Sequence, residues 1–171
     1  FTSLESVEDI SVFDYFVIAS KTSEHYDDLK YINSKVFEKK ILVEKPLYES
    51  IKPNFKIFNQ VFVAYNLRFH PLIIQCKERL KNKKIISARF YAGEYLPMWR
   101  PDSDYRNSYS AKKEEGGGIL LDFSHDIDLV GYLLGEIDKL EAFNSKISNL
   151  DITSDDYMSM IGVTKNNIHF S

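Results

Sequence analysis

Short apolar runs alternate with a helical pattern in the first third of the chain. The runs 13–19, 41–44 and 61–65 are rich in residues that favour β-strands buried on both faces. Between the first two runs, a segment of helical periodicity predicts a helix, and Thr22 or Ser23 is placed to cap its N-terminus. Strand, helix and strand at this spacing predict a βαβ unit with parallel strands.

The pattern changes after the third run. A helix is predicted from Pro71 to about Leu80, and a strand over residues 85–91. The following loop, residues 92–115, holds three tyrosines and one tryptophan, too many aromatic residues for a disordered segment. Loops of this length are uncommon and are usually functional.

Three glycines, residues 116–118, open a second helical pattern that ends at Gly135. Asp122 and His125 lie three positions apart, so a continuous helix makes them neighbours on one flank. A carboxylate beside an imidazole is able to handle a proton. The alternative is an aspartate favoured by the helix dipole and an exposed histidine.

The C-terminal part predicts strands at 139–147 and 157–164, then a hairpin turn and a strand that begins at 168. Because this strand has only four residues, we expect the chain to be a piece of a longer protein. The elements as a whole predict an α/β fold: a parallel α/β part followed by an α+β part with a mainly antiparallel sheet.

Composition narrows the function. The net charge of −3 over 171 residues argues against a nucleic-acid partner. The single cysteine, Cys76, excludes an internal disulfide and suits a reducing compartment. No apolar run is long enough to span a bilayer and no signal peptide opens the sequence, so we expect a cytoplasmic protein without a membrane partner. His70, His169 and Cys76 lack metal-ligand spacing, and no metal is expected.

Four groups of residues follow one another along nearly the whole chain. They are Val17-Ile18-Ala19 with Thr22-Ser23-Glu24-His25, then Val43-Glu44-Lys45-Pro46, then Asn66-Leu67-Arg68-Phe69-His70-Pro71, and Gly116-Gly117-Gly118 with Asp122, His125 and Asp128. In this order and spacing, the groups resemble the Gfo/Idh/MocA family of oxidoreductases.

The resemblance implies a partial Rossmann-type domain over residues 1–68 and a truncated substrate and oligomerisation domain over residues 69–171. It implies NAD or NADP as cofactor and a secondary alcohol of a sugar or sugar-nucleotide as substrate. It also implies a homo-oligomer formed through the sheet of the second domain.

Two departures from the family pattern matter. The Gly-x-Gly-x-x-Gly turn and the acidic residue that hold a dinucleotide are absent, so we expect the chain to begin after the first two strands of the domain and to bind a dinucleotide weakly. Asp122 and His125 are separated by two residues, whereas the common family pattern has three.

The chemistry also follows from the residue types. When hydride leaves a carbinol carbon, the hydroxyl proton needs a base. An unperturbed imidazole titrates close to neutral pH, so His125 suits that role, with Asp122 orienting the ring or a substrate hydroxyl. Lys45 follows a predicted strand, where a cation would stabilise a developing alkoxide. The resemblance assigns Lys45 a catalytic role and makes the Lys45–Pro46 bond a candidate for cis; the alternative is a surface lysine paired with Glu44.

The resemblance places five residues at the cofactor site: Ala19, Thr22, His25, Glu44 and Asn66. For His25 the alternative is a surface histidine near a helix start.

The long loop offers groups for an acidic substrate. Arg100, Tyr105, Arg106 and Tyr109 would suit a carboxylate or phosphate, as in a nucleotide-sugar or an acidic sugar. The alternative is that its aromatic residues pack the loop onto its own domain. Asp128 would contact substrate or orient the helix.

Two functions remain open. The first is an NAD(P)-dependent sugar oxidoreductase whose catalytic half lies in this chain. The second is a non-catalytic module that has the family scaffold and binds a sugar or associates through its sheet.

Overall fold

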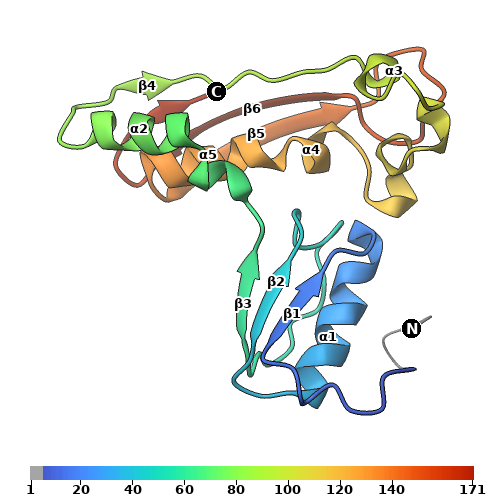
Figure 1. The fold of residues 1–171 in the computed structure, drawn as a ribbon. Helices are drawn as coiled ribbons and strands as arrows, with labels where there is room; N and C mark the ends of the chain where they lie inside the picture. Colours follow the sequence, from blue (N-terminus) through green and yellow to red (C-terminus); the bar gives the residue numbers. More distant parts are fainter. Residues whose placement is uncertain (1–5) are drawn as a thin grey trace. The chain divides into compact units, whose positions relative to one another are not determined.

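The computed structural model describes residues 6–171, which form two compact units (Figure 1). The units divide between Ala64 and Tyr65, whereas the domain boundary was expected after residue 68. The first unit holds a parallel sheet and the second a mostly antiparallel one, so the predicted fold class is confirmed.

The N-terminal unit is built on three parallel strands. They are β1 (Tyr15–Ile18), β2 (Lys40–Val43) and β3 (Gln60–Val63), in the order β1-β2-β3. Helix α1 (His25–Lys35) connects the first two, which confirms the predicted βαβ unit.

One face of this sheet and α1 share an apolar core. Because side chains alternate along a strand, Phe16 and Ile18 point into the core while Tyr15 and Val17 stay exposed. The buried members of the core are Ile10, Phe16, Ile18, Leu29, Ile32, Val36, Ile41 and Val43.

The N-terminus of α1 differs from the prediction. A 3₁₀ helix, Thr22–Glu24, precedes it, and neither this turn nor α1 has a side-chain cap. The expected capping role of Thr22 or Ser23 is therefore wrong. Thr22 is buried instead.

The C-terminal unit contains a four-stranded sheet in the order β4-β7-β6-β5. Strand β6 (Tyr157–Thr164) pairs antiparallel with β5 (Ile137–Ser145) and with β7 (His169–Phe170). Strand β4 is only Ser87–Ala88, and it pairs parallel with β7. The predicted strand 85–91 is thus shorter than expected.

The α-helices outside the long loop of this unit are α2, α4 and α5. Helix α2 covers Pro71–Leu80, as predicted. The predicted single helix after Gly118 is two helices, α4 (Ile119–Asp122) and α5 (Ser124–Leu134), because Phe123 adopts φ −96° and ψ 21°.

The loop over residues 92–115 has structure of its own. It contains helix α3 (Leu96–Trp99) and the 3₁₀ turns Tyr105–Asn107, Tyr109–Ala111 and Lys113–Glu115. Among the described residues, no helix has the length and apolar character needed to cross a bilayer.

Candidate functional site

The first group of candidate residues follows the carboxyl ends of β1 and β2. Ala19 comes directly after β1 and Glu44-Lys45-Pro46 directly after β2. The two segments are joined because Glu44 N donates to the Ile18 carbonyl at 2.9 Å. Open α/β sheets bind their ligands outside this edge, so the arrangement suits a ligand site.

The Lys45–Pro46 peptide bond is cis, which confirms the prediction for this bond. Lys45 is half-buried, while Ala19 and Glu44 are exposed. The Glu44 carboxylate accepts from the backbone N–H of Lys45 at 3.3 Å. A carboxylate and an ammonium group therefore stand at the same strand end.

His25 is not the surface histidine of the alternative interpretation. As the first residue of α1 it is 1% exposed. Its Nδ1 lies 3.0 Å from the Pro46 carbonyl oxygen and its Nε2 lies 3.1 Å from the Ser20 carbonyl oxygen. The ring thus bridges the loops that follow β1 and β2, behind the exposed residues.

The second group lies in the C-terminal unit. Asn66 is exposed at the start of the 3₁₀ helix Asn66–Phe69. Tyr65, just before it, meets the His125 ring edge-to-face, with centroids 5.6 Å apart and an interplanar angle of 80°. Sequence reasoning missed Tyr65, and no local pattern links it to a residue sixty positions away.

Asp128 is engaged by Arg68. Arg68 Nε lies 2.8 Å from Asp128 Oδ2, and Arg68 Nη2 lies 2.5 Å from Oδ1, with the aspartate side chain 7% exposed. Such a bidentate pair is geometrically specific. It favours the interpretation in which Asp128 orients α5, and the substrate role stays a prediction.

Asp122 ends α4 and interacts with Tyr109. Burial, together with the charge of Asp122 and a hydrogen bond to it, raises the pKa of Tyr109. The phenol therefore stays protonated and donates to the carboxylate. This contact ties the long loop to the helix that carries Asp122.

Arg100 lies against aromatic rings of the same loop. Its guanidinium carbon is 5.8 Å from the Trp99 ring centroid and 5.6 Å from that of Tyr109. Trp99 in turn packs near Phe123, with centroids 5.9 Å apart. Stacking of this kind leaves the edge of a guanidinium available for an anion.

Tyr105 and Arg106 make contacts within the C-terminal unit. The Tyr105 hydroxyl accepts from the backbone N–H of Asp151 at 3.2 Å. Arg106 pairs with Asp104, with Nη2 2.8 Å from Oδ2, and the guanidinium lowers the pKa of that carboxyl. These contacts favour a structural role, and their substrate contact stays a prediction.

The glycines before α4 allow close approach of two other segments. A Cβ at Gly117 would overlap the Tyr109 carbonyl oxygen, and Gly118 has φ 119°. Asp155, which sequence reasoning missed, caps α4: its backbone oxygen accepts from Ile119 N at 2.9 Å and its Oδ2 accepts from Leu120 N at 3.0 Å. No sequence signal joins positions this far apart.

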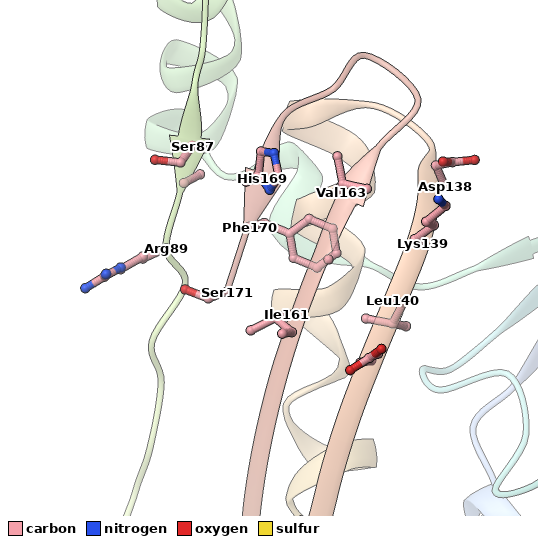
Figure 2. A pocket seen from close by; sticks show the side chains of 13 residues that line it. Ser87, Arg89, Asp138, Lys139, Leu140, Ile161, Val163, His169, Phe170 and Ser171 are labelled. Carbon is pink, nitrogen blue, oxygen red and sulfur yellow. The ribbon is translucent and has the colours of Figure 1, made fainter.

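Two hollows of the C-terminal unit are larger than the small space of about 50 Å³ beside Asp122. One, of about 490 Å³, lies between residues 90–94, α5 and β6. The other is a shallow groove of about 870 Å³ on the sheet, lined by Arg89, Leu140 and Ile161 among others (Figure 2). Neither Asp122 nor His125 lines them.

The described residues fit part of a dinucleotide site. The strand ends carry exposed and half-buried polar groups, while the sequence lacks a Gly-x-Gly-x-x-Gly cradle for a pyrophosphate. Within residues 6–171, no group of three or more His, Cys, Asp or Glu side chains is arranged to hold a metal ion.

Comparison with solved structures gives the same fold at low sequence identity. A levoglucosan dehydrogenase, in complex with NADH and levoglucosan, has a TM-score of 0.73 and 23% identity over 99% of this chain and 50% of its own. The WlbA dehydrogenase from Bordetella pertussis, in complex with NADH and UDP-GlcNAcA, has a TM-score of 0.68 and 16% identity over 92% of this chain and 50% of its own. A super-repressor mutant of Gal80p from Saccharomyces cerevisiae has a TM-score of 0.74 and 18% identity over 100% of this chain and 52% of its own.

The chain therefore spans about half the length of the structures it matches. No curated protein sequence gives a significant match. A sequence model of the GFO/IDH/MocA C-terminal domain matches residues 73–171, more than half of the chain. The chain belongs to the GFO/IDH/MocA family.

Proposed function

We propose that the chain is part of an NAD(P)-dependent oxidoreductase that acts on a secondary alcohol of a sugar or sugar-nucleotide. The observation that carries the proposal is Glu44-Lys45-Pro46 directly after β2, at the ligand-binding edge of a parallel sheet. The family match, and the NADH and sugar ligands of the resembling dehydrogenases, support it.

In this proposal Lys45 and His125 handle the hydroxyl proton. The Lys45 ammonium stabilises negative charge on the substrate oxygen, and the His125 imidazole takes the proton. Asp122 orients a hydroxyl or the imidazole, and Tyr109 holds the Asp122 carboxylate in place by donating to it. The nicotinamide, when bound, supplies the hydride acceptor or donor.

The cofactor is NAD or NADP. Its site is lined, through backbone and polar side-chain groups, by Ala19, Thr22, Glu44 and Asn66. His25 belongs to the same site as a buried residue. A longer protein would have to supply the pyrophosphate cradle, because the described strand ends lack one.

The substrate carries an anionic group in this proposal. Arg100 recognises it, because its guanidinium stacks on two rings and no ion pair within residues 6–171 uses it. Asp128, Tyr105 and Arg106 contribute to the shape of the site, through the contacts with Arg68, Asp151 and Asp104.

The test is an NADH titration by fluorescence, on this chain and on the longest open reading frame that contains it. Binding and sugar-dependent turnover by the longer form are expected. Lys45→Ala and His125→Ala should each lower turnover by about 100-fold or more. No NADH binding by the longer form would end the proposal, and unchanged turnover in a variant would remove that residue from the mechanism.

We also propose a homo-oligomer formed through the sheet of the C-terminal unit. On β5 and β6, Phe143, Tyr157 and Ile161 share one face, and all three are exposed. The groove of Figure 2 lies on the same sheet. Sedimentation velocity tests it: a dimer or larger species is expected, Ile161→Glu should dissociate it, and a wild-type monomer would contradict the idea.

The alternative is a non-catalytic module that binds a sugar or associates through the sheet. The resemblance to Gal80p, of which the matched structure is a super-repressor mutant, favours this alternative. A panel of sugars and sugar-nucleotides separates the two functions. Tight sugar binding by the longer form, without turnover in the presence of NAD or NADP, would favour the module.

A further inference from the structure

His25 joins two loops whose other residues belong to the proposed cofactor and catalytic site. Both ring nitrogens lie within hydrogen-bond distance of backbone carbonyl oxygens, those of Ser20 after β1 and Pro46 after β2. With 1% of its surface exposed, the ring has no free edge to offer to a ligand. Its contribution to a site must therefore pass through the backbone that it holds.

The ring itself is held firmly. His25 is the first residue of α1, and that helix is anchored in the core by Leu29 and Ile32, both buried. A buried side chain on an anchored helix has few alternative rotamers, because close-packed neighbours block them. The position of the imidazole is thus set by the core of the N-terminal unit.

The two carbonyl contacts are not equivalent. A neutral imidazole has one N–H and one lone pair, so it donates to only one of the two carbonyl oxygens. The Nδ1–Pro46 contact is buried, whereas the Nε2–Ser20 contact is partly exposed. A buried carbonyl left without a donor costs more than one that water reaches, and this favours the N–H on Nδ1, donating to Pro46.

Holding the Pro46 carbonyl also places Lys45. The peptide bond between Lys45 and Pro46 is planar, and the pyrrolidine ring fixes φ of Pro46. The orientation of the Pro46 carbonyl then depends on a single soft dihedral, ψ of Pro46, and a hydrogen bond to the carbonyl sets it. The Cα of Lys45 lies in that peptide plane, so its position is tied to the imidazole through one soft dihedral.

We propose that His25 is a positioning residue: its Nδ1–H holds the Pro46 carbonyl and thereby fixes where Lys45 stands at the end of β2. The catalytic consequence rests on the proposed function, because it requires Lys45 to act on substrate. The structural part, that this hydrogen bond holds residues 44–47, does not rest on the proposed function.

The first experiment addresses the structural part on the 171-residue chain. Two-bond ¹H–¹⁵N spectra of the histidine rings should show His25 Nδ1 protonated and Nε2 unprotonated at neutral pH. His25→Asn keeps an amide N–H near the position of Nδ1, whereas His25→Gln reaches toward the position of Nε2. The backbone amides of Glu44, Lys45 and Leu47 should shift in His25→Gln and in His25→Ala, and return toward wild type in His25→Asn.

Three results would overturn the proposal. These are a protonated Nε2 with a bare Nδ1, amides of residues 44–47 that do not respond to His25→Gln, and a His25→Asn spectrum no closer to wild type than that of His25→Gln. If His25→Ala does not fold, the ring spectrum of the wild type and the comparison of His25→Asn with His25→Gln still test the proposal.

The second experiment addresses the catalytic part, on the open reading frame used for the turnover assay. His25→Gln should lower kcat by about 10- to 100-fold, since a misplacement near 1 Å costs about that much. The KM for the sugar should change far less, and His25→Asn should restore most of kcat. Equal losses in the Asn and Gln variants, or a change confined to KM, would overturn the catalytic part. A wild type without turnover would instead refute the proposed function. The first experiment would still test the hydrogen bond between His25 and Pro46.

Discussion

In the N-terminal unit, the residues after β1 and β2 are supported by an apolar core, and the ring nitrogens of the buried His25 lie within hydrogen-bond distance of a carbonyl oxygen in each loop. In the C-terminal unit, the carboxylate of Asp128 ties α5 to Arg68, the carboxylate of Asp155 accepts from the start of α4, and glycines before α4 admit close backbone contact. Its buried aliphatic and aromatic cluster has only four members: Val130, Leu134, Ile168 and Phe170.

This difference separates two ways to support a site. Apolar burial is non-directional, so it holds a strand end firmly with few specific contacts. Hydrogen bonds and charge pairs are directional, and each contributes little net free energy, yet leaving one partner unsatisfied is costly. The N-terminal unit should therefore respond most to lost volume, and the C-terminal unit to lost acceptors or to added atoms.

The largest effect is expected from Ile41→Ala in the N-terminal unit. Ile41 is 0% exposed in the apolar core, and truncation should lower the free energy of unfolding by about 3 kcal/mol. Val17, on the neighbouring strand, points to the other face and is 57% exposed. Urea unfolding of Val17→Ala should differ from wild type by less than about 0.5 kcal/mol. Equal losses in both variants would mean that the two faces are buried alike.

A comparable loss, about 2 kcal/mol, is expected from an added methyl group in the C-terminal unit. The Cβ of Gly117→Ala would lie 2.7 Å from the carbonyl carbon of Ser110, and backbone atoms of this kind do not yield easily. At Gly131, inside α5, an added Cβ meets nothing within 4 Å. Gly131→Ala should instead raise the unfolding free energy by about 0.5–1 kcal/mol. An unchanged free energy of unfolding for Gly117→Ala would mean that the backbone at residues 109–110 yields readily to an added methyl group.

The N-terminal unit was largely predictable from the sequence, because its strands and helix are set by local patterns. The strands predicted at 13–19, 41–44 and 61–65 appear within one or two residues at every end, and the cis bond before Pro46 was expected from the resemblance. The burial of His25 was not predicted, because it depends on two loops that meet only in the folded chain.

The C-terminal unit was predicted less completely. Helix α2 and strand β6 match the expected ranges, since both have clear periodicity. The helix break at Phe123 could not be predicted from the periodicity of the sequence, because apolar residues recur on both sides of it. The Tyr109–Asp122 contact and the capping of α4 by Asp155 join separate segments, so no local pattern reports them.

A smaller effect, about 1 kcal/mol, is expected from the cap of α4. Asp155→Ala removes the carboxylate oxygen that accepts from the backbone N–H of Leu120. This N–H, in the first turn of α4, then loses its side-chain acceptor. Asp155→Asn keeps an oxygen in the same place and should retain most of the unfolding free energy. Hydrogen exchange at Leu120 should quicken in the Ala variant and stay slow in the Asn variant. Equally fast exchange in both would mean that charge, rather than the hydrogen bond, holds the helix start.

The smallest effect, and the one that tests the directional contacts most finely, concerns two aspartates that line the 490 Å³ hollow. Burial raises the pKa of Asp126, against a smaller opposing effect of His125. Burial also acts to raise the pKa of Asp156, but hydrogen bonds from Ser148 and Ile147 outweigh it, so the pKa of Asp156 lies below the ordinary 3.8.

The two shifts have opposite consequences for stability. A raised pKa means that the folded state binds the proton more readily than the unfolded chain, so ionised Asp126 disfavours folding at neutral pH and the penalty fades as pH falls through the raised pKa. A lowered pKa means that ionised Asp156 favours folding above 3.8, and this contribution is lost as pH falls through the lowered pKa. Asp126→Asn should therefore raise the unfolding free energy at pH 7 by less than about 1 kcal/mol, since partial exposure screens the charge. Asp156→Asn should lower the unfolding free energy at pH 7. In urea unfolding measured from pH 7 into acid, both variants should approach the wild type. The difference between Asp126→Asn and wild type should close above pH 3.8, and that between Asp156→Asn and wild type below pH 3.8. A loss of stability in both variants at pH 7 would mean that Asp126 has a partner in the folded chain that outweighs its burial.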